Sequence, residues 1–141
     1  MKILLPVDGS ENSLRAVRHI IAMKQHERDP IEVHLLNVQL PIASGAVKMF
    51  ISKQQLNDFY HDEGVAVLKE ARALLDNAGV SYQHHIGVGD LASTIVSYAR
   101  EKQCQQIVIG TRGRGSFTGA LLGSVATKVI HLADMPVLLI K

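Results

Sequence analysis

One segment indicates how the whole chain folds: Gln106-Ile107-Val108-Ile109-Gly110-Thr111-Arg112-Gly113-Arg114-Gly115-Ser116-Phe117-Thr118-Gly119-Ala120-Leu121-Leu122-Gly123-Ser124-Val125. It begins as a short apolar run rich in β-branched residues, which is typical of a buried strand. It continues as a loop that holds five of the eleven glycines and resumes at Ser124 with a helical pattern. The order predicts a strand, a glycine loop and a helix.

A glycine loop that leads into a helix is suited to binding an anion. Glycine lets main-chain N–H groups approach a ligand closely, and the start of a helix offers unpaired N–H groups and the positive end of the helix dipole. Phosphate is the obvious ligand, and hydroxyl and guanidinium groups within the segment would add donors and charge: Thr111, Ser116, Ser124, Arg112 and Arg114. The alternative is a flexible turn in which Ser124 merely caps the helix.

Two common phosphate motifs do not fit these residues. A P-loop requires Gly-Lys-Ser/Thr after four intervening residues, and no lysine occupies that place. The dinucleotide fingerprint G-x-G-x-x-G would start at Gly113 and Gly115 but then meets Thr118, with Gly119 one position late. Neither motif is present.

The pattern that does fit is Gly110-x2-Gly113-x9-Gly123-Ser124, and with it the chain resembles the universal stress protein family, in its ATP-binding branch. The resemblance extends to Pro6-Val7-Asp8-Gly9-Ser10 after the first strand and to the closing segment 134–140, Asp-Met-Pro-Val-Leu-Leu-Ile. It covers essentially the whole chain, as one domain of residues 1–141.

The resemblance implies a site for ATP, with Mg²⁺ or another divalent cation bridging phosphate oxygens. It implies that Asp8 contacts the ribose hydroxyls and that main-chain groups near Val38 meet the adenine. Without the resemblance, Asp8 reads equally well as a solvated turn residue at the start of a helix. No catalytic residue and no protein metal ligand is assigned. The predicted binding set is Pro6, Asp8, Val38, Gly110, Thr111, Arg112, Gly113, Gly115, Gly123, Ser124 and Val125.

Hydrophobic periodicity predicts five strands that alternate with four helices. Such alternation is typical of a doubly wound parallel α/β sheet covered by helices on both faces. In the family the strand order is 3-2-1-4-5, which would bring Asp8 beside the glycine loop. The expected strands are Lys2–Val7, Ile31–Val38, Val80–Ile86, the run from Gln106, and Val137–Ile140; the expected helices follow Ser10, span Lys53–Asn77, follow Asp90, and span Ser124–Ala133.

Two segments suggest further contacts. Residues 39–52 are long and apolar for a simple connection, so they either cover the nucleotide, meet a partner chain, or are merely mobile. In the family's strand order, Val137–Ile140 is an edge strand with apolar side chains. Pairing with the same strand of a second chain would cover that edge, so a homodimer is expected.

Composition excludes several classes of function. The 141 residues carry a net charge of +2 with scattered lysines and arginines, which gives no argument for nucleic acid or a membrane surface. Cys104 is the single cysteine, so no intramolecular disulfide is possible. The apolar run Met1–Leu5 is too short for a signal peptide or a membrane span. A cytoplasmic protein is the expectation.

Three alternatives compete with a regulatory ATP-binding module in stress response. A slow ATPase would need a group that orients water, and none is evident near the motif. A phosphoacceptor receiver domain would use Asp8 but needs further acidic residues and a late lysine at the switch point. A nucleotide-independent structural dimer would leave the glycine loop unexplained.

Overall fold

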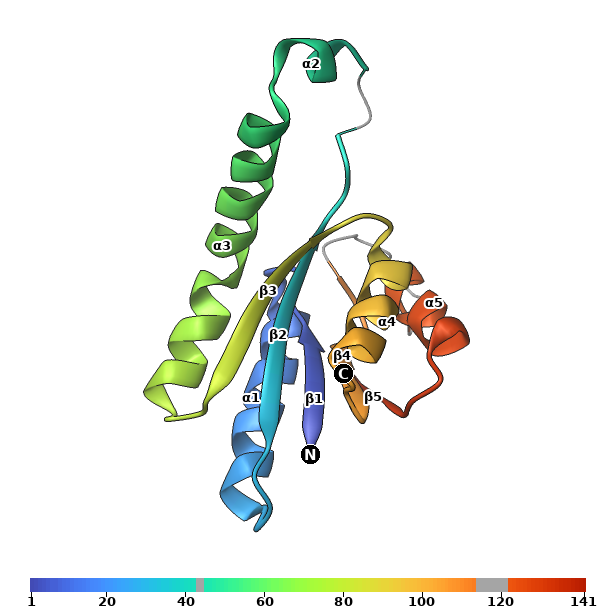
Figure 1. The fold of residues 1–141 in the computed structure, drawn as a ribbon. Helices are drawn as coiled ribbons and strands as arrows, with labels where there is room; N and C mark the ends of the chain where they lie inside the picture. Colours follow the sequence, from blue (N-terminus) through green and yellow to red (C-terminus); the bar gives the residue numbers. More distant parts are fainter. Residues whose placement is uncertain (43–44, 114–121) are drawn as a thin grey trace.

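The computed structural model describes residues 1–42, 45–113 and 122–141. In this part of the chain, strands and helices alternate except that two helices follow the second strand (Figure 1). The strands are β1 (Lys2–Pro6), β2 (Glu32–Gln39), β3 (Tyr82–Val88), β4 (Gln106–Gly110) and β5 (Val137–Ile140), and the helices are α1 (Glu11–His26), α2 (Gly45–Phe50), α3 (Lys53–Asn77), α4 (Leu91–Glu101) and α5 (Ser124–Leu132).

The five strands form one parallel sheet in the order β3-β2-β1-β4-β5. β1 is central: Lys2 pairs with Glu32 of β2, and Ile3 pairs with Gln106 of β4. Connections leave β1 and β4 in opposite directions, which makes the gap between their carboxyl ends a switch point where such folds bind ligands. The predicted doubly wound fold and its strand order are confirmed.

Helices cover both faces of the sheet. On one face α1 and α3 pack over alternate strand residues such as Ile3, Leu5 and Leu35. On the other face α4 and α5 pack over their neighbours Leu4 and Leu36. Because both faces are buried, the central strands carry apolar residues on both faces, and this is why they appear in the sequence as largely apolar runs.

The bounds of β1, β2 and α5 differ from the sequence prediction by one residue and those of β3 by two, and one helix was not predicted. The third strand was expected at Val80–Ile86 but spans Tyr82–Val88. Val80 belongs instead to the turn that follows α3, where Gly79 has a φ of 66° and the Val80 N–H donates to the Leu75 carbonyl oxygen at 3.0 Å. The segment 39–52 contains the short helix α2, which has no buried residue and was not predicted.

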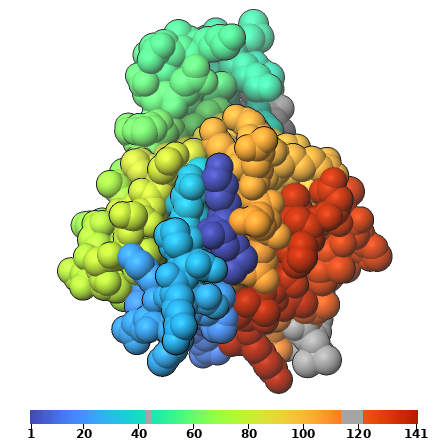
Figure 2. All heavy atoms as spheres, turned by 60° about the horizontal axis from the view of Figure 1, so that its bottom comes forward, coloured from blue at the N-terminus to red at the C-terminus, as the bar shows by residue number. Residues whose placement is uncertain are grey.

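The apolar side chains of α2 lie at the end of a projecting arm. Figures 1 and 2 show α2 and the first turns of α3 extending beyond the body of the molecule. Met49 and Phe50 are 83% and 87% exposed there. Residues 43–44, in the connection that leads to this arm, lie outside the described residues.

Gly64, which interrupts the helical pattern of α3, has a packing explanation. It is buried, and a Cβ atom at this position would lie 2.7–2.8 Å from three side-chain atoms of Ile86 on β3. Real Cβ atoms do not approach so closely. The glycine therefore lets α3 pack directly against β3.

Candidate functional site

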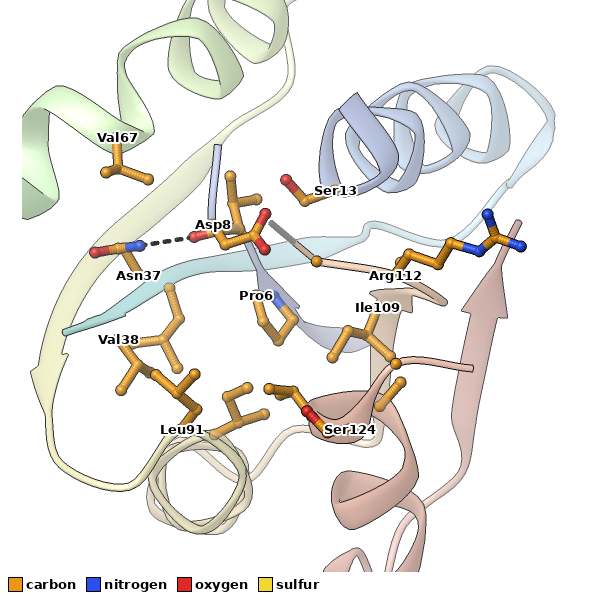
Figure 3. A pocket seen from close by; sticks show the side chains of 18 of the residues that line it. Pro6, Asp8, Ser13, Asn37, Val38, Val67, Leu91, Ile109, Arg112 and Ser124 are labelled. Carbon is orange, nitrogen blue, oxygen red and sulfur yellow. Dashed lines mark hydrogen bonds between the residues drawn. The ribbon is translucent and has the colours of Figure 1, made fainter. Parts of the chain in front are cut away.

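A cavity of about 560 Å³ opens at the carboxyl end of the sheet, at the switch point between β1 and β4 (Figure 3). Every described member of the predicted binding set lines it, and Gly115 lies outside the described residues, as do Arg114 and Ser116. The lining residues are Pro6, Val7, Asp8, Ser13, Leu36, Asn37, Val38, Gln39, Leu40, Glu63, Val67, Leu91, Ile95, Ile109, Gly110, Thr111, Arg112, Gly113, Leu122, Gly123, Ser124, Val125 and Ala126.

Three helices begin at this edge of the sheet, and they differ in how their first turns are satisfied. Ser10 caps α1, accepting a hydrogen bond from the Ser13 N–H at 3.2 Å. Asp90 caps α4, and hydrogen bonds from Ser93 hold the pKa of the Asp90 carboxyl below its usual range. The cap of α5 is Gly123, which has no side chain to accept a hydrogen bond. Of these three helices, α5 is thus the one whose first amides donate no hydrogen bond to a side chain of the cap residue.

The first amides of α5 face the cavity. The first hydrogen bond within α5 runs from the Thr127 N–H to the Gly123 carbonyl oxygen, at 3.0 Å. The amides of Ser124, Val125 and Ala126, which precede Thr127, therefore have no acceptor within the helix. All three residues line the cavity. Unpaired amides and the helix dipole together attract an anion, each dipole contact being worth about 0.3–1 kcal/mol.

The motif glycines permit close contacts between separate segments of the chain. A Cβ at Gly110 would lie 2.5 Å from Asn12 Oδ1 and 2.9 Å from the Asn12 carbonyl oxygen, and a Cβ at Gly113 would lie 2.7 Å from Asp8 Oδ2. A Cβ at Gly123 would lie 3.3 Å from the Thr111 carbonyl oxygen. The loop thus begins directly against Asp8 and the first turn of α1.

The side chains of Asp8 and Arg112 lie on different sides of the contact between the glycine loop and the first turn of α1. The Oδ1 atom of Asp8 accepts a hydrogen bond from the Ser10 N–H at 2.9 Å, and Figure 3 shows the carboxylate at the cavity. The Arg112 side chain extends away from the middle of the cavity in the same view. Arg112 therefore meets the cavity through its main chain, with its guanidinium group at the exposed outer side.

The end of β2 presents main-chain groups to the cavity. Along a strand, these groups point alternately to one neighbour and then to the other. The Leu36 carbonyl oxygen accepts the Val7 N–H at 2.8 Å, on the β1 side, and the Gln39 carbonyl oxygen accepts the Gly89 N–H at 3.0 Å, on the β3 side. Val38 points to the β1 side, two residues beyond the last β1 pair, Pro6 with Leu36. Its N–H and C=O therefore face the cavity.

Sequence reasoning missed several polar residues at or beside the cavity. Asn37 is buried and donates to the Val7 carbonyl oxygen at 2.9 Å, and it accepts a hydrogen bond from Gln39 Nε2. Glu63 lines the cavity from α3, 55 positions after Asp8 in the chain. Asn12 touches Gly110 and Arg112. No sequence signal marks these residues, because their partners are main-chain atoms or distant elements.

A pair of histidines lies between β2 and β3, on the face covered by α4. His34 is buried, with its Nδ1 atom 2.9 Å from His85 Nε2 and its Nε2 atom 3.0 Å from Glu32 Oε1. Burial, and then the neighbouring His34, lower the pKa of His85. The other groups that affect His85 are Lys102, His84 and Glu101, and Tyr98 stacks obliquely on its ring.

Two features are absent from the part of the chain that the structure describes. Residues 1–42, 45–113 and 122–141 contain no group of three or more His, Cys, Asp or Glu side chains placed to hold a metal ion. None of the helices in these ranges has the length and apolar character needed to cross a bilayer.

Comparison with known proteins places this geometry in a recognised group. A family model described as "Universal stress protein family" matches residues 1–141. The universal stress protein MJ0531 of Methanocaldococcus jannaschii is 32% identical over 141 residues, which cover 99% of this chain and 81% of that protein.

Two solved structures are similar along nearly their whole length. The structure of MJ0577, a universal stress protein of the same organism, has a TM-score of 0.84 at 30% identity and covers 99% of this chain and 94% of its own. A universal stress protein from Archaeoglobus fulgidus in complex with dAMP has a TM-score of 0.65 at 25% identity and covers 100% and 98%.

Proposed function

This chain belongs to the universal stress protein family, and from that premise we propose that it binds ATP as a regulatory module in stress response. The phosphates would lie at the glycine loop and the start of α5, the ribose at Asp8, and the adenine at the end of β2. The complete proposed binding set is the one predicted from the sequence, Gly115 included.

The observation that carries the proposal is the start of α5, whose first amides have no acceptor among the described residues. Its first three amides have no helical acceptor, its cap residue is glycine, and it opens into the cavity. α1 and α4 begin at the same edge, but their own side chains cap them. A phosphate group would supply the acceptor that α5 lacks, which a purely structural dimer would not explain.

The remaining cavity wall suits a nucleoside. The main-chain N–H and C=O of Val38 match an adenine edge, which offers one acceptor and one donor, whereas guanine presents the opposite arrangement there. The apolar side chains of Leu91 and Ile95 also line the cavity, and Figure 3 shows Leu91 near Val38. A carboxylate such as Asp8 accepts hydrogen bonds from two neighbouring hydroxyls, which fits a ribose. The A. fulgidus relative in complex with dAMP supports an adenine nucleotide as the ligand class.

A divalent cation would accompany ATP. Mg²⁺ usually retains several waters and binds to phosphate oxygens with one or two carboxylates. The carboxylates among the described cavity residues are Asp8 and Glu63, which fits a cation held mainly by the nucleotide. Neutralising the phosphate charge is the chemistry it would supply. We assign no catalytic residue, and ATP hydrolysis would be weak at most.

The proposal extends to assembly and location. β5 is an edge strand of the sheet, and its residues Val137–Ile140 are half-buried. Pairing of two β5 strands about a two-fold axis would satisfy the free edge. A cytoplasmic location would expose the site to abundant ATP.

Thermal denaturation with added nucleotide tests the proposal. At a hundred times the dissociation constant, ATP with Mg²⁺ should add about 2.7 kcal/mol of stability, or roughly 8 °C in melting temperature. GTP serves as the matched control and should give a smaller shift, because its base does not match Val38. No shift at millimolar ATP would refute nucleotide binding. Native mass spectrometry would show which nucleotide co-purifies and the number of chains.

A further inference from the structure

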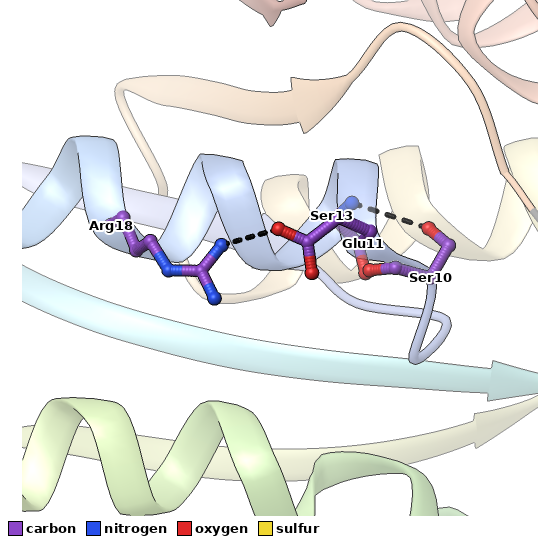
Figure 4. Close-up of polar contacts among 4 residues, drawn as sticks. All are labelled: Ser10, Glu11, Ser13 and Arg18. Carbon is purple, nitrogen blue, oxygen red and sulfur yellow. Dashed lines mark hydrogen bonds and ion pairs between the residues drawn. The ribbon is translucent and has the colours of Figure 1, made fainter.

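Hydrogen bonds stabilise the first turn of α1, which lies against the start of the glycine loop. The Ser10 side chain accepts the Ser13 N–H, and the Ser13 hydroxyl donates to the Ser10 carbonyl oxygen at 2.8 Å. Glu11 forms an ion pair with Arg18 at 2.6 Å on the exposed side (Figure 4). Asn12 lies within this turn, so its backbone has little freedom to move.

Asn12 contacts the glycine loop in two ways. Its Oδ1 atom accepts a hydrogen bond from the Arg112 N–H at 2.7 Å, across a separation of 100 residues. The same oxygen occupies the space into which a Cβ atom at Gly110 would point. One side chain therefore holds the main chain where β4 ends and where the loop turns towards Asp8.

We propose that Asn12 is a positioning residue for phosphate binding, an inference that rests on the proposed function. By holding the Arg112 amide, it fixes the direction in which the chain leaves β4. That direction places Gly113 against Asp8 and close to the start of α5, where a Cβ atom at the cap residue Gly123 would lie 3.7 Å from the Gly113 nitrogen. Asn12 acts through the loop and not by touching the phosphates.

The neutral amide at this position also fits an anionic ligand. A negative side chain in the first turn of a helix is favourable by about 0.3–1 kcal/mol, so aspartate would stabilise α1 more than asparagine does. Aspartate would also accept the Arg112 N–H. It would, however, add a negative charge at the start of the loop, which also contacts the Asp8 carboxylate and is proposed to hold the phosphates. Asparagine supplies the acceptor without that repulsion.

The test combines amide hydrogen exchange with nucleotide titration, both followed by NMR on the full chain. In Asn12→Ala, the Arg112 amide should exchange at least about tenfold faster. The Thr111 amide is the internal control, because it donates to the Ile140 carbonyl oxygen at 2.9 Å and should keep its protection. ATP affinity should fall about tenfold, whereas adenosine affinity, which involves no phosphate, should stay within about twofold.

Two further variants sharpen the result. Asn12→Asp should keep the Arg112 amide protected yet bind ATP more weakly than wild type, with adenosine unchanged; it also preserves the test if Asn12→Ala does not fold. Asn57→Ala, a change of the same kind on the exposed surface of α3, should leave both affinities at the wild-type value.

The outcomes separate this inference from the proposed function. If wild type binds ATP and Asn12→Ala binds it equally well, or loses ATP and adenosine affinity in equal measure, the positioning role is refuted while nucleotide binding stands. If wild type binds neither ATP nor adenosine, the proposed function is refuted and this inference with it.

Discussion

Gly113 and Asp8 should behave as one unit in nucleotide binding. The perturbation is Gly113→Ala, which would place a Cβ atom 2.7 Å from Asp8 Oδ2. The backbone of Gly113 is not in the left-handed region, where only glycine is comfortable, so alanine is excluded by space and not by conformation. Either the carboxylate or the loop must move by several tenths of an ångström.

The size of the effect follows from the contact that is displaced. A hydrogen bond to a charged group contributes about 1.5–3 kcal/mol, and such a shift should cost about half of it. We therefore expect Gly113→Ala to weaken ATP binding about tenfold. Gly45→Ala is the matched control, since a Cβ at Gly45 meets nothing within 4 Å, and its ATP affinity should equal that of wild type.

A double-mutant cycle, measured by isothermal titration calorimetry, isolates the mechanism. Asp8→Ala removes the carboxylate with which the new methyl group collides, so adding Gly113→Ala in that background should change ATP affinity by less than about twofold. The coupling between the two changes should then be about 1 kcal/mol or more. An equal loss in both backgrounds would show that Gly113 serves the phosphates alone and would refute the proposed contact.

Three further predictions concern stability and assembly. Gly64→Ala should lower the free energy of unfolding, measured in urea, by about 1–2 kcal/mol, because overpacking against Ile86 outweighs the gain in helix propensity. In an Ile86→Ala background this loss should vanish. An unchanged loss in that background would contradict the contact between Gly64 and Ile86. Acidification from about pH 7.5 to pH 5.5 should lower the free energy of unfolding of the wild type, because His85 in the unfolded chain binds a proton near pH 6.5 and folded His85 takes one up less readily. Measured by urea unfolding, this loss should be smaller in His85→Gln and should equal the wild-type loss in His131→Gln, a change at an exposed position. Equal losses in all three proteins would contradict the prediction. Leu139→Pro should give a monomer in analytical ultracentrifugation, because it removes an N–H that faces away from β4 and would pair with the second chain. Leu139→Ala keeps that N–H and should stay dimeric. A monomeric wild type would exclude the β5 pairing.

The order of the elements could be predicted from the sequence because burial leaves a direct trace in it. The central strands are apolar on both faces, and α1 and α4 begin at capping residues, Ser10 and Asp90, which the structure confirms as N-caps. The strand order came from the family resemblance and not from periodicity. Once that order is known, Asp8 and the glycine motif must meet at one edge.

What the sequence did not reveal depends on contacts between distant segments. Asn12 looks like an ordinary polar residue of a first helical turn, and its partner is a main-chain amide 100 residues away. Gly64 could be recognised as unusual, but Ile86 could not be named as its neighbour without the packing of α3 on β3. α2 leaves no periodic trace, because none of its side chains is buried.

The position of the cavity also determines when a newly made chain acquires it. Among the described residues, its lining comes from positions 6–8, 13, 36–40, 63, 67, 91, 95, 109–113 and 122–126, and proteins leave the ribosome amino terminus first. A growing chain therefore carries Asp8 long before it carries the amides of α5. A nucleotide that requires both can stabilise only a chain that already includes α5, so ligand present during synthesis would give no protection to chains interrupted before that helix.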